Sequence, residues 1–110
     1  MNNKKKIIRT WKGWTTLENA YIYKDMLINE VFPTVKKNGV IGLEKVSIST
    51  KTKIDEVEFF LTLQFESLDA VKSFAGDNFE QAYIPENAKR VLKRYDKKAE
   101  HYELKEELIL

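Results

Sequence analysis

The chain has 110 residues, 43% of them hydrophobic and 33% charged, which is the length of one domain and too apolar for a disordered chain. Four glycines and two prolines are too few for a linker-like sequence. Nineteen Lys and Arg residues against seventeen Asp and Glu residues leave a formal net charge of +2, which is too balanced to indicate a nucleic-acid or membrane surface by itself.

The first six residues, 1–6, are basic and are expected to be flexible. The apolar stretch behind them is only Ile7-Ile8, whereas a signal peptide needs an apolar core of roughly 7–15 residues. No run approaches the roughly 20 apolar residues that span a bilayer. We therefore expect residues 1–110 to form a single cytoplasmic domain.

The N-terminal part of the chain predicts a strand followed by a helix. Residues 7–12 are β-branched and aromatic, which favours a strand. Thr15 and Glu18 have the spacing of a capping box, so a helix is expected to begin directly after Thr15. Apolar side chains then recur at three- and four-residue steps: Ala20, Tyr23, Leu27 and Val31. Pro33 predicts that this helix ends near residues 30–32.

The middle of the chain predicts two strands. Asn38-Gly39 is a turn signal, and residues 40–51 after it favour extended structure. Residues 56–66 are the clearest strand, because their side chains alternate strictly. One face is fully apolar: Val57, Phe59, Leu61, Leu63 and Phe65. The central part of the other face is mixed: Phe60, Thr62 and Gln64.

The C-terminal part predicts two helices and a last strand. Ser67 is a good N-cap for a helix that Gly76 ends. Pro85 suits the first turn of another helix, whose apolar stripe would be Ala88, Val91, Leu92 and Tyr95. Residues 99–105 return as a strand.

The resulting order, β-α-β-β-α-β, predicts a ferredoxin-like α+β fold with a four-stranded antiparallel sheet and helices on one face only. The Phe60, Thr62 and Gln64 face is too mixed for a core and too apolar for a fully wet surface. We infer that a second copy of the chain covers it, and a monomer with this face exposed is the alternative.

Several short motifs together resemble small proteins of the antibiotic biosynthesis monooxygenase family. They are Arg9-x-Trp11-x-Gly13, Asn19-Ala20-x-x-Tyr23, Glu30-Val31-x-Pro33, Glu58-Phe59, the run from Phe65 to Val71, Phe74-Ala75-Gly76, Phe79-Glu80-x-Ala82 and His101-Tyr102-Glu103. The resemblance implies a homodimer in which two sheets form a shared α+β barrel.

The same resemblance implies two kinds of activity. Some family members are cofactor-independent monooxygenases that oxidise polycyclic phenols, and related proteins bind and degrade haem. The haem-degrading relatives carry a Trp where Phe74 stands here and a haem-ligating His close to where Tyr83 stands. Both departures count against haem degradation. Because tyrosine can ligate haem iron, haem binding stays a lesser alternative, and no other cofactor is expected.

The scarcity of reactive side chains excludes several enzyme classes. Without cysteine there is no disulfide framework, thiolate metal site or catalytic thiol. His101 is the only histidine, which makes a three-ligand zinc site improbable, and no G-x-S-x-G turn presents a serine nucleophile. No metal ligands are therefore assigned.

Arg9 and His101 are the candidate catalytic residues. Arg9 lies on the first strand, which is central in this topology, and its guanidinium could hold an anionic or phenolic oxygen. His101 is the only side chain whose ordinary pKa is near neutrality, so it is the natural general base. A purely structural histidine is the alternative interpretation.

Aromatic side chains are the candidate substrate-binding residues, lining a mostly apolar pocket between helices and sheet: Trp11, Phe59, Phe74, Phe79 and Tyr83. Tyr83 lies in an irregular segment of the kind that closes over pockets. The alternative is that the phenylalanines and Trp11 are core residues and that Tyr83 packs on Phe79.

Together with these candidate residues, the resemblance implies oxidation of an electron-rich aromatic or phenolic small molecule by O₂, without bound metal or flavin. The alternative is a non-catalytic small-molecule-binding or stress-associated dimer. The expected partners are a second copy of the chain and a small aromatic ligand. Nucleic acid is not expected, because acidic residues interleave with the basic ones around the last helix, and no membrane partner is expected either.

Overall fold

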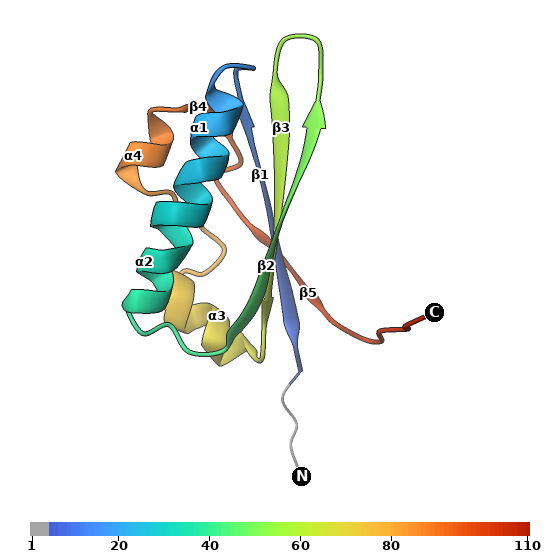
Figure 1. Cartoon of the computed structure of the whole chain (residues 1–110). Coiled ribbons are helices and arrows are strands. Elements are labelled where there is room, and N and C mark those ends of the chain that lie inside the picture. Colours follow the sequence, from blue (N-terminus) through green and yellow to red (C-terminus); the bar gives the residue numbers. More distant parts are fainter. Residues whose placement is uncertain (1–4) are drawn as a thin grey trace.

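A computed structural model describes residues 5–110, so residues 1–4 of the expected flexible segment lie outside the described part of the chain. The elements, in chain order, are β1 (Ile7–Thr15), α1 (Asn19–Met26), the π-helical segment η1 (Leu27–Val31), α2 (Phe32–Lys37), β2 (Leu43–Thr52), β3 (Val57–Phe65), α3 (Leu68–Ala75), α4 (Glu86–Lys89), β4 (Leu92–Tyr95) and β5 (Glu100–Glu103). This is the expected ferredoxin-like α+β order, with helices on one side of the sheet (Figure 1).

The antiparallel sheet has five strands where four were expected. The strand order is β2-β3-β1-β4, and β5 also pairs with β1. β4 pairs with residues 13–15 of β1 and β5 with residues 7–10, so two short strands together fill the place of the fourth strand. The chain between them turns aside to pair with the segment 80–82: the Ala82 N–H donates to the Lys97 carbonyl and the Ala99 N–H to the Glu80 carbonyl.

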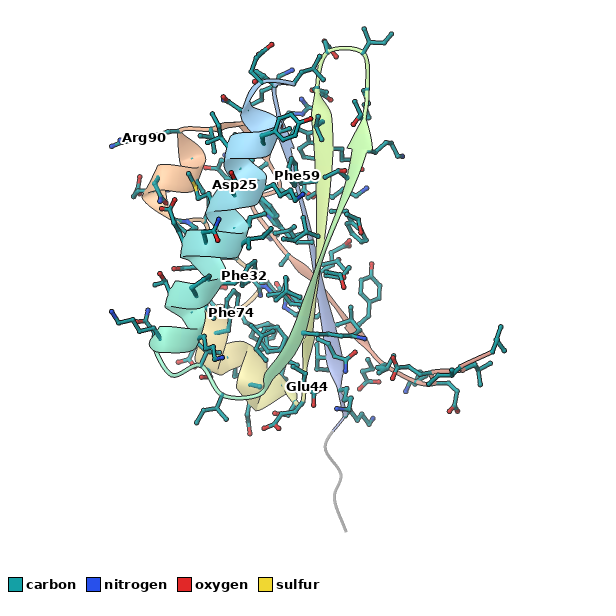
Figure 2. All side chains as sticks on the ribbon, in the orientation of Figure 1. Asp25, Phe32, Glu44, Phe59, Phe74 and Arg90 are labelled. Atoms are coloured by element: carbon teal, nitrogen blue, oxygen red, sulfur yellow. The ribbon has the colours of Figure 1, made fainter. Side chains whose placement is uncertain are left out.

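The alternation of β3 is confirmed. The side chains of its apolar face, Val57, Phe59, Leu61, Leu63 and Phe65, are all buried under the helices. Phe59 meets Tyr23 of α1 edge-on, with ring centroids 4.9 Å apart, and Figure 2 shows it between α1 and the sheet, while Arg90 points outward. On the opposite face Phe60 and Thr62 are half-buried, and Gln64 donates to Glu44 over 2.8 Å.

The first helix differs from its prediction at both ends. Thr15 remains in β1, and the Asn19 N–H donates to Oγ1 of Thr16, so no capping box forms and α1 begins at Asn19. Pro33 does not end the helical segment. The backbone widens over η1, and Pro33 then lies in the first turn of α2, where its missing N–H needs no intrahelical partner.

The predicted last helix is wrong over most of its length. Only Glu86–Lys89 is helical, and Leu92–Tyr95 is a strand. The reason is a tertiary contact. The backbone N–H and C=O groups on the outer edge of β1 need hydrogen-bond partners, and residues 92–95 supply them, which helix and strand propensities cannot predict. Two basic residues of this segment, Lys93 and Arg94, consequently face Glu56, at 3.0 and 2.7 Å.

The predicted signals for the beginning and the end of α3 are confirmed. The Ser67 side chain accepts from the Ala70 N–H at the start of α3, and Gly76 follows its end with φ +85°. β2 begins at Leu43, later than residue 40, because Gly42 adopts φ +90° and so departs from the extended conformation. A side chain at position 42 would also be too close to α3, since a Cβ there would meet the Cβ of Ala70 at 2.6 Å.

Beyond β5 the chain leaves the sheet and extends away from the helices (Figure 1). Leu108, Ile109 and Leu110 are exposed there. In the part of the chain that the structure describes, no helix is long and apolar enough to cross a membrane.

Candidate functional site

A mostly apolar pocket lies between the helices and the sheet. Among residues 5–110, its lining is formed by Arg9, Trp11, Tyr23, Leu27, Val31, Phe32, Leu61, Leu63, Phe74, Tyr83, Ile84, Pro85 and Ala88. The cavity has a volume of about 40 Å³, which is room for about three water molecules. The strands supply its floor, and the segment from Tyr83 to Ala88 closes one side.

Arg9 is the single charged side chain in this lining and is only 3% exposed. It lies on β1, and its Nη1 donates to the Phe79 carbonyl over 2.6 Å while its Nη2 donates to the Gln81 carbonyl over 3.0 Å. The guanidinium also lies 5.3 Å from the centre of the Phe74 ring. Arg9 therefore connects the central strand to the irregular segment that follows α3, and burial lowers its pKa to about 10.

His101 lies beside Arg9 on the neighbouring strand β5 and does not line the pocket. β5 pairs with β1 so that His101 is opposite Arg9, and Nε2 of the imidazole is 2.9 Å from Nη1. A guanidinium cannot accept a hydrogen bond, so Nε2 must be the acceptor and the imidazole must be neutral with its proton on Nδ1. Burial, together with the positive charge of Arg9, lowers the pKa of His101 and favours this neutral form.

The aromatic residues expected to bind substrate divide into two groups. Trp11, Phe74 and Tyr83 line the pocket. The indole N–H of Trp11 donates to the Asp96 carbonyl over 2.7 Å, and Tyr83 meets Phe74 edge-on at 5.5 Å. Phe59 packs on Tyr23 in the core instead.

Phe79 also lies outside the lining. Its ring packs edge-on against the imidazole of His101, with centroids 5.1 Å apart, and its carbonyl accepts from Arg9. Phe79 therefore contributes to holding Arg9 and His101 rather than to the wall of the pocket.

Tyr23 is a pocket residue that the sequence interpretation did not single out. It is 3% exposed, and burial raises the pKa of its phenol above the ordinary value. Its hydroxyl forms no hydrogen bond with any residue between 5 and 110. The available signal was its place on the apolar stripe of the first helix, where a tyrosine brings a hydroxyl toward the core.

Within the described residues, no three His, Asp or Glu side chains gather closely enough to hold a metal ion. Tyr83, the position that the resemblance relates to a haem ligand, is 47% exposed at the pocket.

Comparison with known proteins supports the fold. No protein-family model matches the chain, and a search of curated proteins finds no match. Among solved structures, the chain is similar to a crystal structure from Bacillus cereus whose name gives it provisionally as an antibiotic biosynthesis monooxygenase. The TM-score is 0.63 at 16% identity, over 96% of this chain and 99% of the other. The protein therefore shares its ferredoxin-like α+β fold with this solved structure.

Proposed function

We propose that this protein binds a small aromatic molecule in the pocket between its helices and its sheet and oxidises it with O₂. The observation that carries the proposal is the pocket itself, in which Trp11, Phe74 and Tyr83 surround a single buried cation, Arg9. Aromatic walls suit a flat ring, and one polar group in an apolar lining fixes its orientation. The similar Bacillus cereus structure supports this class of reaction through its fold.

Ligand entry would require Tyr83 to move. The space that is open now holds about three water molecules, less than a substituted ring needs. Tyr83 is half exposed, and the segment that carries it is irregular, so its rotation away from Phe74 disturbs no helix or strand. Closure behind the ligand would separate the reaction from bulk water.

The proposed reaction needs no external reductant. A phenol with an unsubstituted para carbon loses its O–H proton, and the resulting electron-rich ring reacts with O₂ to a hydroperoxide. One oxygen atom becomes the second carbonyl of a quinone, and the other leaves as water with the hydrogen of that carbon. The substrate supplies all four electrons.

Arg9 would favour the phenolate in this reaction, because a nearby positive charge lowers the pKa of an acid. Two bases were open from the sequence, His101 and a pocket water, and Nε2 of His101 already accepts from Arg9. A pocket water is therefore the proton acceptor we favour, with His101 as a positioning residue for the guanidinium.

The test is oxidation of 1-naphthol under ¹⁸O₂. We expect oxygen uptake and one ¹⁸O atom in the 1,4-naphthoquinone product, and loss of both in Arg9→Met. Lys24→Met removes a charge from the exposed side of α1 and serves as the matched control. Full activity in a folded Arg9→Met would refute the proposal. A haem absorption band that Tyr83→Phe abolishes would instead assign haem binding.

Binding without turnover is the second candidate function. It is favoured by the position of His101, which lies outside the described pocket lining and whose Nε2 already accepts from Arg9. Saturable binding of 1-naphthol with no oxygen uptake would support this alternative.

The proposed active form is a homodimer joined through the open face of the sheet. Thr10, Thr62 and Ser47 are neighbours across three strands at the centre of that face. Half-buried Phe60 lies beside them, so a second sheet would cover apolar as well as polar groups. Native mass spectrometry should give a dimer, and Thr62→Arg should give a folded monomer, because it places an unpaired charge in the interface. A wild-type monomer at micromolar concentration would refute this arrangement.

A further inference from the structure

We propose that the ligand of this pocket is an aromatic hydroxy acid whose carboxylate pairs with Arg9 and whose ring hydroxyl meets Tyr23. This inference rests on the proposed binding function and names its substrate class. It follows from two side chains of the same lining, Arg9 and Tyr23, whose polar atoms have unused hydrogen-bonding capacity within residues 5–110.

The hydrogen-bond count of Arg9 points to an acceptor with two oxygen atoms. A guanidinium has five N–H donors in one plane. Three are used, by the carbonyls of Phe79 and Gln81 and by Nε2 of His101. Within residues 5–110 the remaining two donors have no acceptor. A carboxylate offers two oxygens in the planar geometry that a guanidinium matches, whereas a phenolate offers one.

The charge of Arg9 indicates the same group. No carboxylate of the described chain forms an ion pair with this guanidinium, although it is almost completely buried. A buried charge without a counter-charge is costly, so an anionic ligand gains by supplying one. A carboxylic acid, with an ordinary pKa near 4, is already ionised at neutral pH, whereas a phenol, with a pKa near 10, must first lose its proton.

The rest of the lining limits the charge of the ligand to one. Apart from Arg9, every described lining residue is uncharged and most are apolar. A phosphate ester would bring close to two negative charges against a single cation. A monoanionic aromatic acid matches both the charge and the apolar walls.

Tyr23 supplies the second contact point. Its side chain lines the pocket from α1, and Phe59 fixes its ring from the side. Its hydroxyl has no hydrogen-bond partner within residues 5–110, and burial keeps it protonated. A hydroxyl can both donate and accept, so it can bind the phenol of a ligand whose carboxylate lies on Arg9. Two fixed contacts would hold the ring in the pocket, and because the carboxylate then occupies Arg9, this pose concerns binding and not phenolate formation at Arg9.

The test uses two probes that differ in charge and hardly in shape, 4-hydroxybenzoate and 4-hydroxybenzamide, titrated calorimetrically into the full chain at pH 7.5. We expect the acid to bind at least tenfold more tightly than the amide. Equal binding, or tighter binding of the amide, would overturn the inference while leaving the aromatic pocket in place. Failure of both probes to bind at millimolar concentration would overturn the inference and the proposed pocket function together.

Variants separate the two contacts. Arg9→Lys keeps the charge but not the paired donors and should reduce acid binding about tenfold, with the amide unchanged. Tyr23→Phe removes one unpartnered hydroxyl, so the fold should persist while both probes weaken severalfold. Lys24→Met should change neither affinity, because Lys24 is exposed. An unchanged preference for the acid in folded Arg9→Lys would overturn the assignment of Arg9, and unchanged affinities for both probes in folded Tyr23→Phe would overturn the assignment of Tyr23.

Discussion

Thr15 is completely buried at the end of β1, and its hydroxyl has no hydrogen-bond partner among the described residues. It pairs with Val57 on one side and with Leu92 on the other, at the bulge of the β1–β4 ladder. A buried polar group without a partner costs about 1–3 kcal/mol. Valine has nearly the same shape, favours strands equally and replaces the hydroxyl with a methyl group.

Thr15→Val should therefore raise the free energy of unfolding by about 1 kcal/mol or more. For a domain of this size that corresponds to a melting temperature about 4 °C higher. Thr15→Ser is the matched control, because it keeps the hydroxyl and loses the methyl group, and it should be about 1 kcal/mol less stable than wild type. Thermal unfolding followed by circular dichroism measures all three proteins. A Thr15→Val protein that melts at or below the wild-type temperature would refute this reasoning by showing that the hydroxyl has a partner in solution.

Two further predictions concern pH. The bidentate pair with Arg94, reinforced by Lys93, lowers the pKa of Glu56 to about 2. The stability from this pair should be complete above pH 4.3 and decrease as the pH falls toward 2, and Glu56→Gln should melt with a weaker pH dependence over that range. The pKa of His101 is lowered by burial and by Arg9, with Glu80 opposing, so the unfolded chain binds the proton more tightly. Stability should therefore decrease as the pH falls below about 6.5, and His101→Gln should flatten that dependence; an equal slope in the variant would contradict the Arg9–His101 geometry.

Those features of the fold whose causes are local could be predicted from the sequence. The alternation along β3, the Ser67 cap of α3 and the Gly76 that ends it each depend on residues within a few positions of one another. The strand order then follows from connection rules that a β-α-β-β-α-β chain obeys. Of the residues that the sequence interpretation assigned to a pocket, Arg9, Trp11, Phe74 and Tyr83 line the pocket of the structure, whereas Phe59, Phe79 and His101 do not.

The predicted last helix is wrong because its outcome depends on a contact that is distant in the sequence. Leu92 and Tyr95 have helical spacing relative to Ala88, but the unpaired edge of β1 recruits residues 92–95 as a strand. This partner is about 80 positions away in the sequence, so no short window contains the signal. The same applies to Thr15, whose burial beside Leu92 prevents it from capping the first helix.

The candidate site was likewise completed by tertiary structure. The sequence contains one histidine, and an arginine on the first strand, and their side-chain chemistry alone predicted a general base and a group that binds an anionic oxygen. Only the pairing of β5 with β1 joins Nε2 of His101 to Arg9, which engages the lone pair that a base would need. The hydroxyl of Tyr23, which has no hydrogen-bond partner within residues 5–110, emerges in the same way, because whether a polar atom has a partner depends on every segment folded around it.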